Sequence, residues 1–170
     1  SHTYWDAAPI LDAMADGNRH VYTSDATATT RLDFTTAAAG TTAVRTTLGV
    51  GDAVQAAAVI SWARSARFGL GNGGHSRSRL GSIESSSPAI LGRPGIPSWF
   101  PYLAAFEKVR FLEFQAAQQG RANLILVGAK DGMIHAFRTI TTAMTTAPSG
   151  EEAWAFVPPR VAATMVADYT

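Results

Sequence analysis

The fold is decided by the stretch NLILVGAKDGMIHAF, which occupies residues 123–137. Its first six residues, NLILVG, have the pattern of a buried β-strand. The tetrapeptide AKDG follows at 129–132, and its Asp-Gly pair is the strongest dipeptide signal for a tight hairpin turn. Residues 133–137 then predict the return strand. We expect Gly128 and Gly132 to permit a close approach or a positive φ angle at the turn.

Downstream of the hairpin, a Thr-rich loop at 139–149 leads to a predicted strand at 153–157. Two prolines end this strand, and residues 160–169 predict a terminal helix.

Upstream, helical spacing of apolar residues predicts helices over 5–15, 53–68 and 102–119, the second capped by Asp52. Strands are predicted over 20–23, 80–83 and 89–91. We interpret residues 24–47, which are rich in Thr and Ala, as one strand inside a weakly structured loop. The glycine run at 69–74 predicts a flexible loop, and it matches no nucleotide-binding pattern.

Composition limits the class of protein. The 170 residues are 46% hydrophobic and 16% charged, which suits one folded domain. A net charge of +1 gives no case for binding nucleic acid or an anionic membrane. The absence of cysteine excludes disulfides and zinc-thiolate sites. Neither a membrane-spanning apolar run nor a signal peptide is visible.

Three stretches resemble known proteins. Residues 127–137 with 150–158 are similar to one blade of a quinoprotein-type β-propeller, and closer still to the PilY family of type IV pilus proteins. The stretch RLGSIESSSPAILGRP at 79–94 resembles a second PilY segment, and residues 5–23 resemble a third, in family order. Lys130 stands where the family has Asn, and Ser82 where it has Asp.

This resemblance implies a mainly β fold with helical insertions, a partial quinoprotein-like β-propeller. A propeller needs at least four blades of roughly forty residues, so we expect a fragment of roughly one to two blades. We expect an opening helical and loop segment at 1–79, propeller strands at 80–158 with a helical insertion at 102–119, and a terminal helix at 159–170.

The implied function is that of a non-catalytic adhesin and assembly module at the tip of an extracellular type IV pilus. It would support pilus biogenesis, adhesion and twitching motility. The implied partners are minor pilins of the tip complex, a host or abiotic surface, and the rest of the protein's own propeller.

We expect no catalytic residues. The residues expected to matter are structural members of the blade motif: Pro88, Gly128, Asp131, Gly132, His135, Phe137 and Trp154. His135 is predicted to be half-buried and hydrogen-bonded to backbone, with no carboxylate nearby, and Trp154 to pack between blades. Glu151 and Glu152 should face opposite sides of their strand. The arginines between 64 and 93 are expected to be solvated.

No cofactor is expected in this chain. In the PilY family, a loop of alternating Asp residues binds calcium, which takes six to eight oxygen ligands. This sequence has no such loop. Two alternatives stay open: a fragment of a quinoprotein dehydrogenase that binds pyrroloquinoline quinone and calcium, and a propeller scaffold for outer-membrane assembly.

Overall fold

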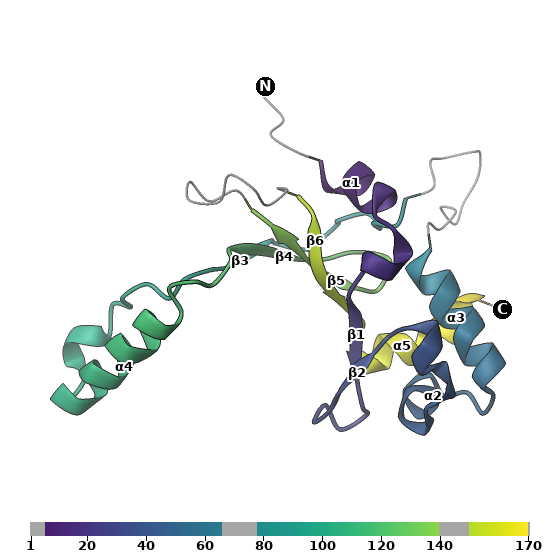
Figure 1. Cartoon of the computed structure of the whole chain (residues 1–170), viewed down its shortest axis with the longest axis horizontal. Helices are drawn as coiled ribbons and strands as arrows, with labels where there is room; N and C mark the ends of the chain where they lie inside the picture. The colour runs from purple at the N-terminus through teal and green to yellow at the C-terminus, as the bar shows by residue number, and fades with distance from the viewer. Residues whose placement is uncertain (1–5, 66–77, 140–149, 170) are drawn as a thin grey trace.

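The computed structural model describes residues 6–65, 78–139 and 150–169 (Figure 1). Its strands are β1 (Val21–Ser24), β2 (Arg31–Asp33), β3 (Ala89–Leu91), β4 (Leu124–Gly128), β5 (Ile134–Arg138) and β6 (Glu152–Phe156). Its α-helices are α1 (Ala7–Ala13), α2 (Thr42–Leu48), α3 (Ala53–Arg64), α4 (Ala105–Ala117) and α5 (Pro159–Tyr169). Three 3-10 helices, η1 (Asp16–Asn18), η2 (Thr36–Gly40) and η3 (Phe100–Tyr102), connect them.

The six strands form one open sheet with the order β2-β1-β6-β5-β4-β3. Strands β3 to β6 are antiparallel neighbours in chain order. Strand β1 then pairs in parallel with β6, and β2 pairs antiparallel with β1 at the far edge. The segment at 1–79 therefore contributes two strands to the same sheet as the segment at 80–158.

The structure confirms a β-sheet with helical parts, although more of the described residues lie in helices than in strands. Four antiparallel strands are the repeating unit of a β-propeller, and β3 to β6 have that arrangement. The sheet of the described residues does not close, and β1 and β2 extend it rather than begin a second sheet. The propeller itself, and the proposed segment boundaries, stay predictions.

The main core lies where helices α2, α3 and α5 gather at the β1 and β6 end of the sheet (Figure 1). Its largest members are Phe34, Leu48, Ile60, Met133 and Met165, all almost fully buried. Helix α5 also covers the hairpin turn, because its side chains lie against Gly132.

Helix α2 corrects the interpretation of residues 24–47 as mainly loop. Thr41 caps it by accepting a hydrogen bond from the Val44 backbone N–H at 3.4 Å, and Gly49 ends it with a φ of 71°. Val44, Thr47 and Leu48 form its buried face. The sequence did not indicate this helix because the intrinsic helix propensity of threonine is low. The caps and the burial of one face stabilise it.

Two other expectations change. Residues 80–83 form no strand, because this segment lies against the β4–β5 turn instead, with the Lys130 N–H bonded to the Ser82 carbonyl. Helix α3 begins after the predicted cap at Asp52 but ends at Arg64. The glycine run at 69–74 and residues 140–149 of the Thr-rich loop lie outside the described residues.

The remaining part of the fold is an arm, defined as residues 92–121 between β3 and β4. It carries η3 and α4 and extends away from the rest of the chain, at the left of Figure 1. None of the residues of α4 is buried. Among the described helices, none is both long and apolar enough to cross a membrane.

Candidate functional site

A buried network of charged side chains connects the hairpin to the start of β1. His135 on β5 and Glu152 on β6 point to the same side of the sheet, and a bulge at Ala136 and Phe137 sets their register. Arg19, just before β1, reaches Glu152 from a position 133 residues earlier in the chain. The network thus joins three neighbouring strands.

The contacts are short and the side chains are enclosed. The His135 Nδ1 lies 2.7 Å from Glu152 Oε1, and its Nε2 lies 2.9 Å from Asp131 Oδ2. Arg19 donates to both Glu152 oxygens, from Nε at 2.9 Å and from Nη2 at 3.0 Å. All four side chains are 0–3% exposed. An ionised His135 therefore completes two carboxylate–cation pairs inside the protein.

Asp131 has a second role in the turn. Its Oδ1 accepts from the Met133 N–H at 2.9 Å, and its Oδ2 accepts from the Gly81 N–H at 2.7 Å. A Cβ at Gly81 would lie only 2.4 Å from the Asp131 backbone nitrogen, so glycine is needed for this approach. Asp131 thereby connects residues 80–83 to the turn of the hairpin.

The pKa directions agree with an ionised network. Burial alone would lower the pKa of His135, but hydrogen bonds to Asp131 and Glu152 raise it above its ordinary value. Burial alone would raise the pKa of Asp131 and of Glu152. The hydrogen bond to His135 holds the pKa of both carboxyl groups below their ordinary values, and at Glu152 the hydrogen bond from Arg19 acts in the same direction.

A second buried arginine continues the network. Arg19 donates to the Arg64 carbonyl at 2.8 Å, and Arg64 donates to the carbonyls of Phe34, Asp16 and Arg19 at 2.8–3.1 Å. Arg64 thus lies between η1, Arg19 and the residue that follows β2, and burial lowers its pKa. The expectation of a solvated side chain is wrong at Arg64, because its guanidinium is the donor to three backbone carbonyls around it.

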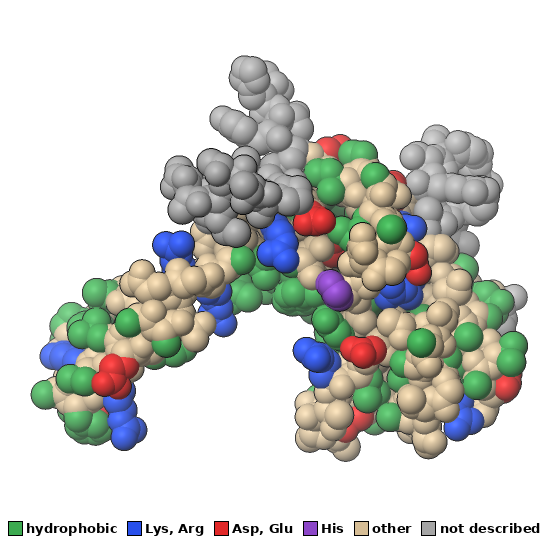
Figure 2. Space-filling view, in the orientation of Figure 1, with side chains coloured by type: hydrophobic (Ala, Val, Ile, Leu, Met, Phe, Trp, Pro, Cys, Tyr) green, Lys and Arg blue, Asp and Glu red, His purple; other side chains and the backbone are tan. Residues whose placement is uncertain are grey.

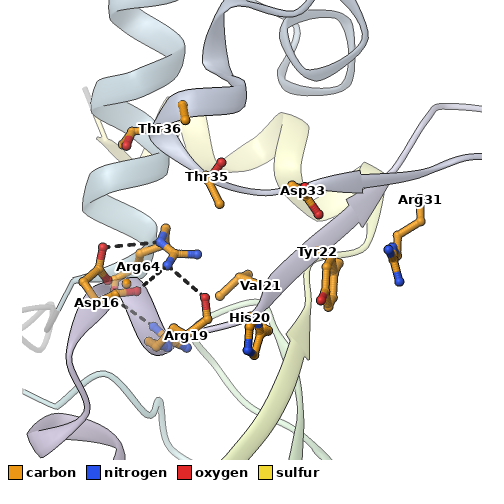
Figure 3. A pocket seen from close by; sticks show the side chains of 12 residues that line it. Asp16, Arg19, His20, Val21, Tyr22, Arg31, Asp33, Thr35, Thr36 and Arg64 are labelled. Carbon is orange, nitrogen blue, oxygen red and sulfur yellow. Dashed lines mark hydrogen bonds and ion pairs between the residues drawn. The ribbon is translucent and has the colours of Figure 1, made fainter.

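A polar pocket of 490 Å³ lies beside Arg19 and Arg64 (Figure 3). Arg19 and Arg64 are its buried charged members, and His20, Arg31 and Asp33 are exposed. The guanidinium of Arg31 lies over the Tyr22 ring, 4.6 Å from its centroid. The remaining lining residues are Asp16, Gly17, Val21, Thr35, Thr36 and Ala37. The two buried guanidinium groups of the pocket are engaged with protein acceptors.

The hydrogen-bonding groups of His135 are paired and closed to solvent. Both ring nitrogens of His135 are occupied by carboxylates, and the ring is fully buried and stacked on Phe137. Across the described ranges, no three His, Cys, Asp or Glu residues are placed to hold a metal ion. Both oxygens of Asp131 accept internal hydrogen bonds, Oδ1 from the Met133 N–H and Oδ2 from the Gly81 N–H. The arrangement acts chemically as a structural charge network.

The sequence-predicted residues separate into two groups. Asp131, Gly132, His135 and Phe137 are brought together at the hairpin, next to α5. Trp154 lies opposite Ala136 and is half-buried, and Pro88 is exposed before β3. Whether Trp154 packs between blades stays a prediction.

Some details of these predictions are confirmed and others are wrong. Gly132 has a φ of 86°, as expected, and a Cβ there would lie 2.7 Å from Val161 Cγ1. Gly128 has neither a positive φ nor a close approach, since its nearest neighbour would be Ser86 Oγ at 3.5 Å. His135 is fully buried and bonded to carboxylates, not half-buried and bonded to backbone. Its i−4 neighbour Asp131 was the missed signal.

Glu152, Arg19 and Gly81 were missed as members of the site. Glu151 and Glu152 do face opposite sides, with Glu152 buried and Glu151 38% exposed. A carboxylate at an inward position of an apolar strand was the available signal, because such a charge requires a partner. The sequence could not say which arginine supplies it.

Comparisons with known proteins show similarity over part of the chain. No protein-family model matches the chain, and no solved structure matches it. Over 84 residues, 48% of its length, the chain is 37% identical to the type IV pilus biogenesis factor PilY1 of Pseudomonas aeruginosa, strain PAO1. PilY1 of strain PAK matches equally. The match spans 6% of the length of either PilY1. About half of this chain is therefore related to PilY1, through a partial and distant match.

Proposed function

We propose that this chain is part of a type IV pilus biogenesis factor, where it serves as a non-catalytic adhesion and assembly module at the pilus tip. The observation that carries the proposal is the 37% identity to PilY1 over 84 residues. Because the match covers a small share of PilY1, the activity of the whole protein is part of the proposal.

The fold and the site support a scaffold rather than an enzyme. Strands β3 to β6 have the antiparallel arrangement of a propeller blade, and further blades would lie elsewhere in a longer protein. Among the described residues of the hairpin, the groups with shifted pKa values belong to the buried network of Asp131, His135 and Glu152. This network is closed to solvent. Such a network can orient strands, but it cannot reach a substrate.

Location and partners follow from the same proposal. The module would be extracellular at the pilus tip, in contact with minor pilins, a host or abiotic surface, and the rest of its own propeller. We expect it to need no cofactor of its own, because the sequence has no alternating Asp loop that would supply the oxygen ligands of calcium.

The test is genetic and biochemical, in the bacterium that makes the protein. An antibody against the chain should detect it in the sheared pilus fraction of the wild type, and not in that of a strain lacking the major pilin. Deleting its gene should reduce surface pili, twitching and surface attachment, and a plasmid copy should restore them. Normal piliation in the deletion strain, with the protein absent from sheared pili, would overturn the proposal.

A further inference from the structure

The polar pocket beside Arg19 and Arg64 has no part in the function proposed above. Its volume of 490 Å³ falls within the range of about 300–1,000 Å³ that is usual for small-molecule sites. Of its twelve lining residues, only Gly17, Val21 and Ala37 lack a polar side chain. Because most ligand pockets have a mainly apolar lining, this one is suited to a polar ligand.

Four of the lining residues lie on one face of β1 and β2. Tyr22 pairs directly with Asp33, so their side chains share a face of the sheet. His20 lies two residues before Tyr22, and Arg31 lies two residues before Asp33, which directs both to the same face. Within the described ranges, no hydrogen bond engages the side chains of His20, Tyr22 or Asp33. Their polar groups are therefore free to bind a ligand.

The buried side of the pocket adds a further donor. A guanidinium has five N–H groups. The Nη2 of Arg64 donates to the carbonyls of Asp16 and Arg19, its Nη1 donates to the Phe34 carbonyl, and its Nε lies 3.6 Å from the Asp16 carboxylate. The second N–H of Nη1 has no acceptor among the described residues, although the side chain is only 5% exposed. A ligand oxygen that reached this N–H would satisfy it.

The charges of the pocket balance, so neither an anion nor a cation is favoured. Each arginine of the lining has a carboxylate nearby: Asp16 for Arg64, Asp33 for Arg31 and Glu152 for Arg19. An anion would meet the two carboxylates that line the pocket, and a cation would meet the guanidinium groups. A ligand without net charge avoids both kinds of repulsion.

Hydroxyl groups suit this lining, because each hydroxyl both donates and accepts hydrogen bonds. Figure 3 shows Asp16 and Arg64 at one end of the pocket and Asp33 and Arg31 at the other, so that an acceptor and a donor lie near each other at both ends. A carboxylate can only accept and a guanidinium can only donate. A ligand with several neighbouring hydroxyls can pair with both groups at once.

We propose that the pocket binds the hydroxyl groups of a neutral carbohydrate, either a single sugar or the end of a short oligosaccharide. Asp33 accepts hydrogen bonds from the sugar, Arg31 and Arg64 donate to it, and His20 and Tyr22 provide further polar contacts. The proposal goes beyond the pilus function, because it rests on the lining of the pocket alone.

The first test titrates the full chain with the methyl glycosides of mannose, galactose and N-acetylglucosamine, up to ~100 mM, and follows the histidine ring signals by NMR. At least one glycoside should shift the His20 signals in a saturable way. The His135 signals should not move, because that ring is fully buried in the charge network. Inorganic phosphate and methylguanidinium, at the same concentration, should not displace the sugar.

The second test substitutes the exposed lining residues one at a time. Asp33→Ala and, separately, Arg31→Ala should each weaken sugar binding at least about tenfold. The matched controls are Asp168→Ala and Arg93→Ala, since both residues are exposed and lie outside the pocket. They should leave the affinity unchanged, and a thermal melt of each variant checks that it is folded.

Three outcomes would overturn the proposal. One is that none of the glycosides shifts the His20 signals at ~100 mM. Another is that binding survives both Asp33→Ala and Arg31→Ala. The third is that phosphate or methylguanidinium displaces the sugar, because the pocket would then bind an ion.

Discussion

The main core and the arm contain similar apolar residues, which are buried in the core and exposed on the arm. Leu48 on α2 and Leu112 on α4 both lie in short helices with apolar residues at helical spacing. Leu48 is 1% exposed among α3, α5 and the sheet, whereas Leu112 is 45% exposed. An apolar stripe therefore shows that a helix has a face to bury, and the tertiary structure decides whether this chain buries it. Substitutions in the core and on the arm should therefore change the free energy of unfolding by different amounts.

The largest effect should come from removing the central acid of the buried network. Glu152→Ala leaves the Arg19 guanidinium and the His135 ring without their shared carboxylate, in a site closed to water. We expect the free energy of unfolding to fall by about 3–5 kcal/mol in urea denaturation. Glu151→Ala, on the other side of β6, should change it by no more than about 0.5 kcal/mol. Equal effects would contradict the network.

The two leucines give the most direct comparison of core and arm. Leu48→Ala should cost about 2–5 kcal/mol, because it removes buried contacts and opens a cavity. Leu112→Ala should stay within about 0.5 kcal/mol under conditions where the chain is monomeric. Denaturation curves of the two variants, measured at low concentration, check this. A large loss at Leu112 would mean that the arm is covered within the monomer.

A smaller effect is expected at the hairpin turn. Gly132→Val puts a branched side chain at a φ of 86° and against Val161 and Met165 of α5, so we expect a loss of about 1–3 kcal/mol. Gly128→Ala meets only ordinary contact with Ser86 and should stay within about 1 kcal/mol. A thermal melt of Gly132→Val that matches the parent would contradict the turn assignment.

The mildest perturbation is a change of pH. Because folding raises the pKa of His135, its contribution to stability is complete below about 6.5 and is lost as pH rises through the raised value. Because folding lowers the pKa of Asp131 and Glu152, their contribution is present above about 4.5 and is lost as pH falls through the lowered values.

Stability should therefore be greatest between about pH 4.5 and 6.5 and should decline on either side. Denaturant midpoints measured across the pH range test this profile. A midpoint that stays constant from about pH 6 to 10 would show that folding does not raise the pKa of His135.

Much of the local structure could be predicted from the residues themselves. The Asp-Gly pair specifies the turn of the β4–β5 hairpin, and Asp52 caps α3 by accepting from the Gln55 N–H at 2.9 Å. These features depend on contacts within a few residues, so their signals are present in the sequence. Helix α2 was missed because its signal is in the caps and not in the propensity of its threonines.

The sequence by itself determined the hairpin, the strand that contains Trp154 and the helices α1, α3, α4 and α5, because adjacent residues decide them. Only the tertiary structure decided the parallel position of β1, the approach of Gly81 to Asp131, the exposure of α4 and the choice of Arg19 as the partner of Glu152. Arg19 and Glu152 are 133 residues apart, and any arginine could have supplied the charge. A buried carboxylate requires a cationic partner, but the path of the backbone determines which cationic side chain lies beside it.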